Sequence, residues 1–207
     1  MQFTGKEKIF YCTGSICYNY SNILNRFYSL SGGGFMNYCE LKTNDVANGP
    51  GVRVSLFVSG CTHRCKGCFN EASWDFNAGE EFTKDVEDKI LEALSPSYVS
   101  GLTLLGGEPF EHANQQGLLP FLRRVKETYP QKNIWCFTGY LFDKDILGRM
   151  CKEWPETKEM LDMIDVLVDG EFILEKRNLM LKFKGSSNQR TIDVKSSLKE
   201  NKIITLY

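Results

Sequence analysis

The sequence predicts an α/β fold built on a mostly parallel sheet. Strand-like apolar stretches alternate with amphipathic, helix-like stretches, and glycine-containing turns follow several of the strands. Such alternation is typical of parallel strands joined by right-handed crossovers. With 207 residues and 42% hydrophobic content, the chain can bury a core of its own.

Residues 1–35 differ from the rest. They are rich in Tyr, Ser, Asn and Gly, show weak periodicity and end in Gly32-Gly33-Gly34. We expect a loosely held N-terminal extension over 1–35 and a compact domain over 36–207. Because Met36 could itself start a compact protein, residues 1–35 are also open to interpretation as an upstream-start artefact. Cys12 and Cys17 are interpreted as ordinary residues of this extension.

The first predicted strand covers residues 52–60, where valines and a leucine alternate with other residues and so share one face. The turn signal Asn48-Gly49-Pro50-Gly51 precedes it. A helix is expected after Thr83, since acidic residues occupy its first turns and apolar residues recur on one side. The apolar residues are Val86, Ile90, Leu91 and Leu94.

Later elements follow the same alternation. Two further helices are expected at 117–129, with Pro120 tolerated in the first turn, and at 143–154. The remaining predicted strands are 101–105, 133–140, 163–170 and 181–185. Because loops that follow parallel strands meet at one edge of a sheet, we expect the strand-end loops to form a single site. These loops contain residues 61–68, 106–109, 138–140, 168–171 and 185–190.

Three cysteines lie within residues 61–68 at the spacing C-x3-C-x2-C. They are Cys61, Cys65 and Cys68. Three thiolates can hold three irons of a 4Fe-4S cluster and leave the fourth iron open to an outside ligand. Gly60 and Gly67 allow the loop to bend and its N–H groups to approach the cluster sulfides.

The three-cysteine loop resembles the cluster loop of the radical S-adenosylmethionine superfamily. Over about residues 36–192, the wider pattern resembles the activating proteins of anaerobic (class III) ribonucleotide reductases. The motifs that carry this resemblance are NGPG (48–51), LFVSGC (56–61), CKGCFN (65–70), Trp74, LGGEP (105–109), IWCFTGY (134–140), VLVDG (166–170) and GSSNQR (185–190). Their combination is specific, whereas a single GGE or TGY would be a weak signal.

The resemblance implies an incomplete (β/α) barrel whose open side is covered by a protein partner. It also implies an oxidoreductase that binds S-adenosylmethionine at the open iron of a 4Fe-4S cluster. Reductive cleavage would yield a 5′-deoxyadenosyl radical, which would remove hydrogen from a glycine of the reductase. No catalytic side chain is expected, because the radical belongs to the cofactor.

Site residues follow from the resemblance position by position. The expected cluster ligands are Cys61, Cys65 and Cys68. The expected contacts of S-adenosylmethionine are Gly67, Cys68, Phe69, Gly106, Gly107, Glu108 and Thr138. Glu108 stands where the family usually has aspartate, so the charge is kept on a longer side chain. The polar loop 185–190 is a candidate docking element, with Arg190 as the residue to test. His112 is expected to be a loop or capping residue, and Cys136 a small core residue.

Several function classes are disfavoured. The formal net charge is −1, which provides no basic field for nucleic acid or an anionic membrane. No run of about 18 apolar residues is present. Clustered cysteines without a signal peptide indicate a cytoplasmic, reducing location. The expected partners are the large subunit of the anaerobic reductase and a low-potential electron donor such as flavodoxin, in a homodimer or a complex with the reductase.

Two alternative functions stay open. The protein could activate a different glycyl-radical enzyme, although the additional ferredoxin-like cysteine insert of many such activases is absent. From another class, it could be a zinc-binding interaction module that uses Cys61, Cys65, Cys68 and His63. A thiol redox pair, Cys65-x-x-Cys68, is a weaker interpretation of the same loop.

Overall fold

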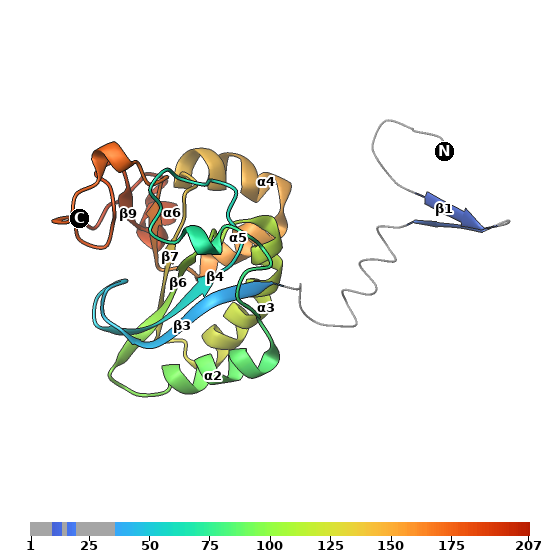
Figure 1. Ribbon diagram of the computed structural model, residues 1–207, viewed down its shortest axis with the longest axis horizontal. Helices are drawn as coiled ribbons and strands as arrows, with labels where there is room; N and C mark the ends of the chain where they lie inside the picture. Colours follow the sequence, from blue (N-terminus) through green and yellow to red (C-terminus); the bar gives the residue numbers. More distant parts are fainter. Residues whose placement is uncertain (1–9, 14–15, 20–35) are drawn as a thin grey trace. The chain divides into compact units, whose positions relative to one another are not determined.

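The computed structural model describes residues 10–13, 16–19 and 36–207 (Figure 1). The chain divides into two units, residues 1–34 and 35–207, which are described separately. In the first unit, β1 (Phe10–Thr13) pairs with β2 (Ile16–Asn19) in an antiparallel two-stranded sheet. The predicted extension over 1–35 lies mostly outside the described residues and stays a prediction.

The second unit is built on a seven-stranded sheet with the order β5-β3-β4-β6-β7-β8-β9. The strands are β3 (Asn37–Asp45), β4 (Val52–Val58), β5 (Glu80–Glu81), β6 (Val99–Gly106), β7 (Asn133–Phe137), β8 (Val166–Asp169) and β9 (Arg190–Asp193). The four central strands, β4, β6, β7 and β8, are parallel. The expectation of an α/β fold with a mostly parallel core is confirmed, whereas the antiparallel strands at both edges were not predicted.

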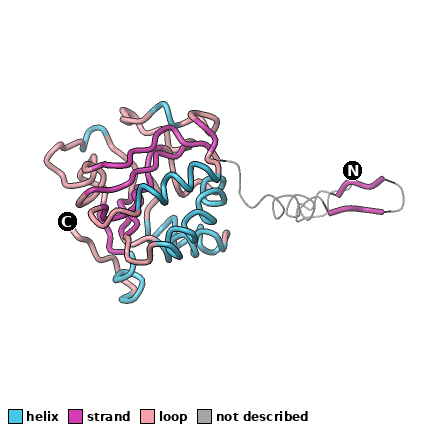
Figure 2. Tube along the Cα trace, turned by 90° about the horizontal axis from the view of Figure 1, so that it is seen from below, coloured by secondary structure: helices cyan, strands magenta, loops and turns pink. Residues whose placement is uncertain are grey.

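The helices cover one face of this sheet. They are α2 (Lys84–Leu94), α3 (His112–Thr128), the π-helix η2 (Phe142–Met150), α4 (Cys151–Glu153), α5 (Pro155–Met163) and α6 (Val194–Glu200), with short 3-10 turns η1 (Glu71–Ser73) and η3 (Leu174–Lys176). Figure 2 shows the longer helices gathered along one side of the strands. None of the helices in the described residues combines the length and the apolar character that crossing a membrane requires.

Each central strand is buried on both faces, but the two faces meet different neighbours. Leu102, Leu104 and Cys136 join the main core together with residues of α2, α3 and η2. Because side chains alternate along a strand, Trp135 and Val168 point the other way, into a smaller cluster that Phe183 partly covers. The second face is therefore the one that remains open for a site. The prediction that Cys136 is a small core residue is confirmed.

Helix α3 corrects one prediction. It begins at His112, five residues before the predicted start, so Pro120 lies inside the helix and not in its first turn. A proline inside a helix removes one backbone hydrogen bond. The helix nevertheless continues, because Leu118, Phe121 and Leu122 on either side of the proline are completely buried in the main core. Tertiary packing outweighs the local penalty here.

Other boundaries also differ from the predictions. Residues 181–185 are not a strand, and the last strand is β9 (Arg190–Asp193), antiparallel to β8. The predicted helix at 143–154 exists but opens as a π-helix, in which the Ile146 amide donates to the Leu141 carbonyl five residues back. Helix α5 and strand β3 were missed. Thr83 occupies the N-cap of α2 as expected, although its side chain makes no capping hydrogen bond.

The close contact of β6 with β7 supplies a test of the sheet. Gly101 pairs with Asn133, and a Cβ at Gly101 would lie 1.9 Å from the Asn133 carbonyl oxygen. Gly101→Ala should force these strands apart and lower the free energy of unfolding by about 1–3 kcal/mol, the usual effect of overpacking. Urea denaturation measures this, with the exposed Lys89→Ala as control. Equal stability of the two variants would contradict the register.

Candidate active site

The loops that follow the parallel strands surround one cavity of about 650 Å³. Nine residues expected from the sequence to hold a cluster or cofactor all line it. They are Cys61, Cys65, Gly67, Cys68, Phe69, Gly106, Gly107, Glu108 and Thr138. The volume lies within the roughly 300–1,000 Å³ typical of small-molecule sites. The expectation that strand-end loops 61–68, 106–109 and 138–140 lie close together is therefore confirmed.

The three-cysteine loop is fastened to its surroundings by backbone contacts. The Gly60 and Cys61 amides donate to the carbonyls of Ser73 and Trp74 at 2.8 and 3.1 Å. Gly60 has a φ of +90°, and a Cβ there would lie 2.2 Å from the Phe76 ring. Gly67 also has a positive φ, so both glycines make the bends expected of them.

The cysteines suit an iron–sulfur cluster in several respects. Cys61, Cys65 and Cys68 are free and partly buried. The Asn70 amide lies 3.4 Å from Cys68 Sγ and the Phe172 amide hydrogen-bonds to Cys65, and such N–H···S contacts are a recognised lever on cluster properties. Burial, reinforced by the Glu108 carboxylate, raises the pKa of Cys61 to about 12, and burial also raises the pKa of Cys65. Metal would therefore displace protons on binding.

Glu108 is the most connected side chain of the site. It is 1% exposed, and its carboxylate accepts hydrogen bonds from Thr138 Oγ1 at 2.8 Å, the Gly139 amide at 2.7 Å and the Phe110 amide at 2.8 Å. These bonds join the end of β6 to the end of β7. Glu108 was expected to contact the cofactor, and the structure adds that its oxygens already position Thr138 and Gly139.

His63 lies between two carboxylates. Its Nδ1 is 2.9 Å from Glu171 Oε1, and its Nε2 is 3.2 Å from Glu108 Oε2. Its ring packs edge-on against Tyr140, with 4.5 Å between ring centres. Burial lowers the pKa of His63, but the hydrogen bonds and charges of Glu108 and Glu171 outweigh this and raise the pKa to about 9. Both ring nitrogens of His63 therefore face carboxylates.

The zinc alternative therefore finds no support in the geometry. His63, its required fourth ligand, faces carboxylates instead of thiols. Among residues 36–207, no three His, Cys, Asp or Glu side chains converge closely enough to hold a single ion. His112, expected to be a loop or capping residue, begins α3 and stacks on Trp154 with ring centres 4.5 Å apart.

One wall of the site is formed by residues 171–175, of which the sequence analysis placed Glu171 at the rim but missed residues 172–175. Glu171 contacts His63, and Lys66 lies 3.8 Å from Glu175. A Cβ on Gly67 would lie 3.1 Å from Leu174. The segment thus runs beside the three-cysteine loop along its length. The only signal for it was the position of Asp169-Gly170 at a strand end.

Side chains of the polar loop 185–190 form hydrogen bonds with the backbone of residues 170–173. Ser186 is completely buried, and its Oγ accepts from the Ile173 amide at 3.2 Å. Gln189 Nε2 donates to the Gly170 carbonyl, and Asn188 Nδ2 donates to the Glu171 carbonyl, both at 2.9 Å. The loop reaches the rim because β9 runs antiparallel to β8, so the residues before β9 lie where the parallel strands end.

Arg190 is an internal anchor. Its Nε lies 2.9 Å from Asp169 Oδ1, its Nη2 also binds Asp169, and Nη2 lies 2.7 Å from Asp143 Oδ1. Asp169 is fully buried. These contacts raise the pKa of Arg190 above its ordinary value. An Arg190→Ala variant would disturb the rim itself, so the expectation that it isolates docking needs correction.

Comparison with known proteins agrees with the site. The family model described as a 4Fe-4S single cluster domain matches residues 47–192. The anaerobic ribonucleoside-triphosphate reductase-activating protein of Haemophilus influenzae is 46% identical over 156 residues, or 74% of this chain and 96% of that protein. The proteins of the same name in Escherichia coli K12 and Enterobacteria phage T4 are 39% and 40% identical, over 96% and 92% of their lengths.

The match to this family model shows that the chain belongs to a class of iron–sulfur proteins with a single 4Fe-4S cluster domain. Within that class, the chain belongs to the family of anaerobic ribonucleoside-triphosphate reductase-activating proteins.

The contacts of Glu108 provide a test of the site's construction. Glu108→Ala would leave Thr138, the Gly139 amide and His63 without a buried partner. We expect the free energy of unfolding to fall by about 3–5 kcal/mol, as for other broken buried ion pairs. Urea denaturation of the cluster-free protein measures this. The control is Glu175→Ala, because Glu175 is 70% exposed. A Glu108→Ala protein as stable as the control would refute the assigned role.

Proposed function

We propose that the protein activates an anaerobic ribonucleotide reductase by generating its glycyl radical. The observation that carries the proposal is the meeting of three free cysteines and three strand-end loops around one cavity. When bound, a 4Fe-4S cluster would supply the electron that cleaves S-adenosylmethionine to methionine and the 5′-deoxyadenosyl radical, which takes hydrogen from a glycine of the reductase. The family membership of the chain supports this activity.

In this proposal, Cys61, Cys65 and Cys68 hold three irons. The fourth iron would be left open for the cofactor, because His63, the histidine of the same loop, is engaged by Glu108 and Glu171. The chain thereby keeps a free coordination position, as catalytic metal sites do.

The cofactor would occupy the cavity between the cysteine loop and the strand ends. Gly106 and Gly107 let backbone carbonyls approach its ammonium group, since no side chain stands in the way. Gly67, Cys68 and Phe69 would contact the adenine. Thr138 borders the cavity while its hydroxyl donates to Glu108, so Glu108 and Thr138 act as a pair that orients this wall.

The fold is interpreted as an incomplete (β/α) barrel over residues 36–207. The helices cover the outer face of the sheet, and the inner face borders the cavity. The reductase would cover the open side. Residues 1–35 are proposed to be a separate extension, because the chain divides into two units, 1–34 and 35–207.

The proposed partners are the large subunit of the reductase and a low-potential electron donor such as flavodoxin, in a homodimer or a complex with the reductase. A cytoplasmic location fits a protein whose function requires free cysteines. A partner other than this reductase, within the glycyl-radical enzymes, is disfavoured by the names of the relatives. Nucleic acid and membrane binding are not proposed, since the net charge is −1.

An anaerobic activation assay tests the proposal directly. The reconstituted protein, the reductase, S-adenosylmethionine and a reductant are mixed, and a glycyl radical is sought by EPR. Formation of the radical only when all components are present is the expected result. A reconstituted protein that binds one tight zinc and yields no radical would overturn the proposal.

Individual cysteines should differ sharply in this assay. Cys61→Ala, Cys65→Ala and Cys68→Ala should each lose the brown absorbance near about 400 nm expected of iron–sulfur thiolate sites, together with cofactor cleavage. The matched control is Cys151→Ala, because Cys151 is also partly buried but does not line the cavity. Cofactor cleavage at the wild-type rate by any of the three variants would remove that cysteine from the ligand set.

A further inference from the structure

The mouth of the cavity carries unusually exposed apolar side chains. Phe69, Leu179 and Met180 are 82%, 83% and 88% exposed, the highest values among the large hydrophobic residues described. Phe69 and Leu179 also line the cavity, although they come from segments far apart in the sequence. Single exposed apolar residues are ordinary, but a group that borders a functional site indicates an interaction surface.

The segment that presents Leu179 and Met180, residues 174–184, is anchored in the fold. Arg177 and Ser186 form an isolated antiparallel bridge at its base, and the Asn178 amide donates to the Gly185 carbonyl at 3.2 Å. Phe183 packs edge-on against Trp135 with ring centres 5.4 Å apart. Because Phe183 packs inward against Trp135, the segment is held with Leu179 and Met180 exposed to solvent.

The same segment is positively charged. Residues 174–184 contain four basic residues, Lys176, Arg177, Lys182 and Lys184, and one acidic residue, Glu175. Residues 36–207 as a whole have 22 basic and 25 acidic residues, a net charge of −3. Lys66 of the three-cysteine loop lies 3.8 Å from Glu175, which offsets that single acidic charge. A basic segment therefore borders the apolar mouth of an otherwise acidic domain.

We infer that the 174–184 segment and Phe69 form the docking surface for the protein substrate, and that the matching surface of the reductase is apolar and acidic. The inference rests on the proposed function, because a glycine of the partner must then enter the cavity at this mouth. Apolar contact would supply most of the affinity, and the opposite charges would steer encounter and orientation.

Direct binding tests the inference without requiring catalysis. Association of the full-length protein with the anaerobic reductase is measured by biolayer interferometry, at low and at physiological salt. Met180→Asp and Lys182→Glu should each raise Kd at least tenfold. Neither side chain lines the cavity. Higher salt should weaken the wild-type complex more than the Lys182→Glu complex, because the charge attraction is screened.

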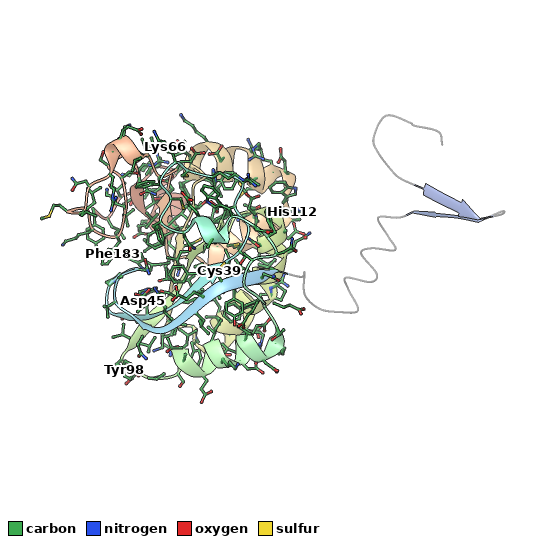
Figure 3. The ribbon with its side chains drawn as sticks, in the orientation of Figure 1. Cys39, Asp45, Lys66, Tyr98, His112 and Phe183 are labelled. Atoms are coloured by element: carbon green, nitrogen blue, oxygen red, sulfur yellow. The ribbon has the colours of Figure 1, made fainter. Side chains whose placement is uncertain are left out.

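Matched controls lie elsewhere on the domain. Tyr98→Asp changes another exposed apolar residue, 63% exposed, which Figure 3 shows at the opposite end of the domain from Lys66. Lys89→Glu reverses an exposed charge on α2. Both control variants should bind within twofold of wild type. If Met180→Asp and Lys182→Glu also bind within twofold of wild type, the docking surface is wrong.

A second measurement separates this inference from the proposed function. Cleavage of S-adenosylmethionine without reductase should be unchanged in Met180→Asp and Lys182→Glu, while the reductase concentration for half-maximal radical formation should rise at least tenfold. If the variants change the Kd for the reductase as predicted but the wild-type protein cleaves no cofactor, the proposed function is refuted and the docking surface is still supported. Equal half-maximal concentrations for wild type and variants overturn the docking surface alone.

Discussion

The arrangement of the site depends on one buried carboxylate. Glu108 stands at the end of β6, accepts hydrogen bonds from Thr138 and Gly139 at the end of β7, and lies 3.2 Å from His63 in the three-cysteine loop after β4. Three loops that are distant in sequence thus share one acceptor. A buried carboxylate is tolerated only when its lone pairs are used, so these contacts make each loop's position depend on the others.

A second buried carboxylate performs the same task one strand further on. Asp169 ends β8 and binds Arg190, the first residue of antiparallel β9, while the Phe142 amide donates to it at 2.8 Å. This pairing turns the chain back, so that residues 170–189 pass along the rim of the site. The ion pair between Arg190 and Asp169 therefore helps to position the segment beside the three-cysteine loop. The two buried carboxylates, Glu108 and Asp169, thus position the loops around the site.

Local patterns were sufficient to predict the parallel strands and the helix after Thr83, whereas nine residues that line the cavity were predicted from the family resemblance. Strands β4 and β6 are buried on both faces, and their apolar runs can be recognised from the sequence alone. Helix α3 was misplaced because Pro120 signals a helix start, whereas buried neighbours keep the helix intact. The contacts of the 171–175 wall with His63 and Lys66 were not predicted, since they join residues about a hundred positions apart. No local pattern encodes such pairings.

The exposed mouth of the cavity follows from the way the sheet is covered. Helices from the crossovers pack on one face, whereas the opposite face carries a smaller apolar cluster of Trp135, Val166 and Val168, partly covered by Phe183. Within residues 36–207, no α-helix contributes to the cluster on this side. In the proposed function, a radical must be kept from water, and exclusion of water is a recognised use of active-site closure. A partner that completes the enclosure would explain the exposed apolar residues, because these side chains would be buried only in the complex.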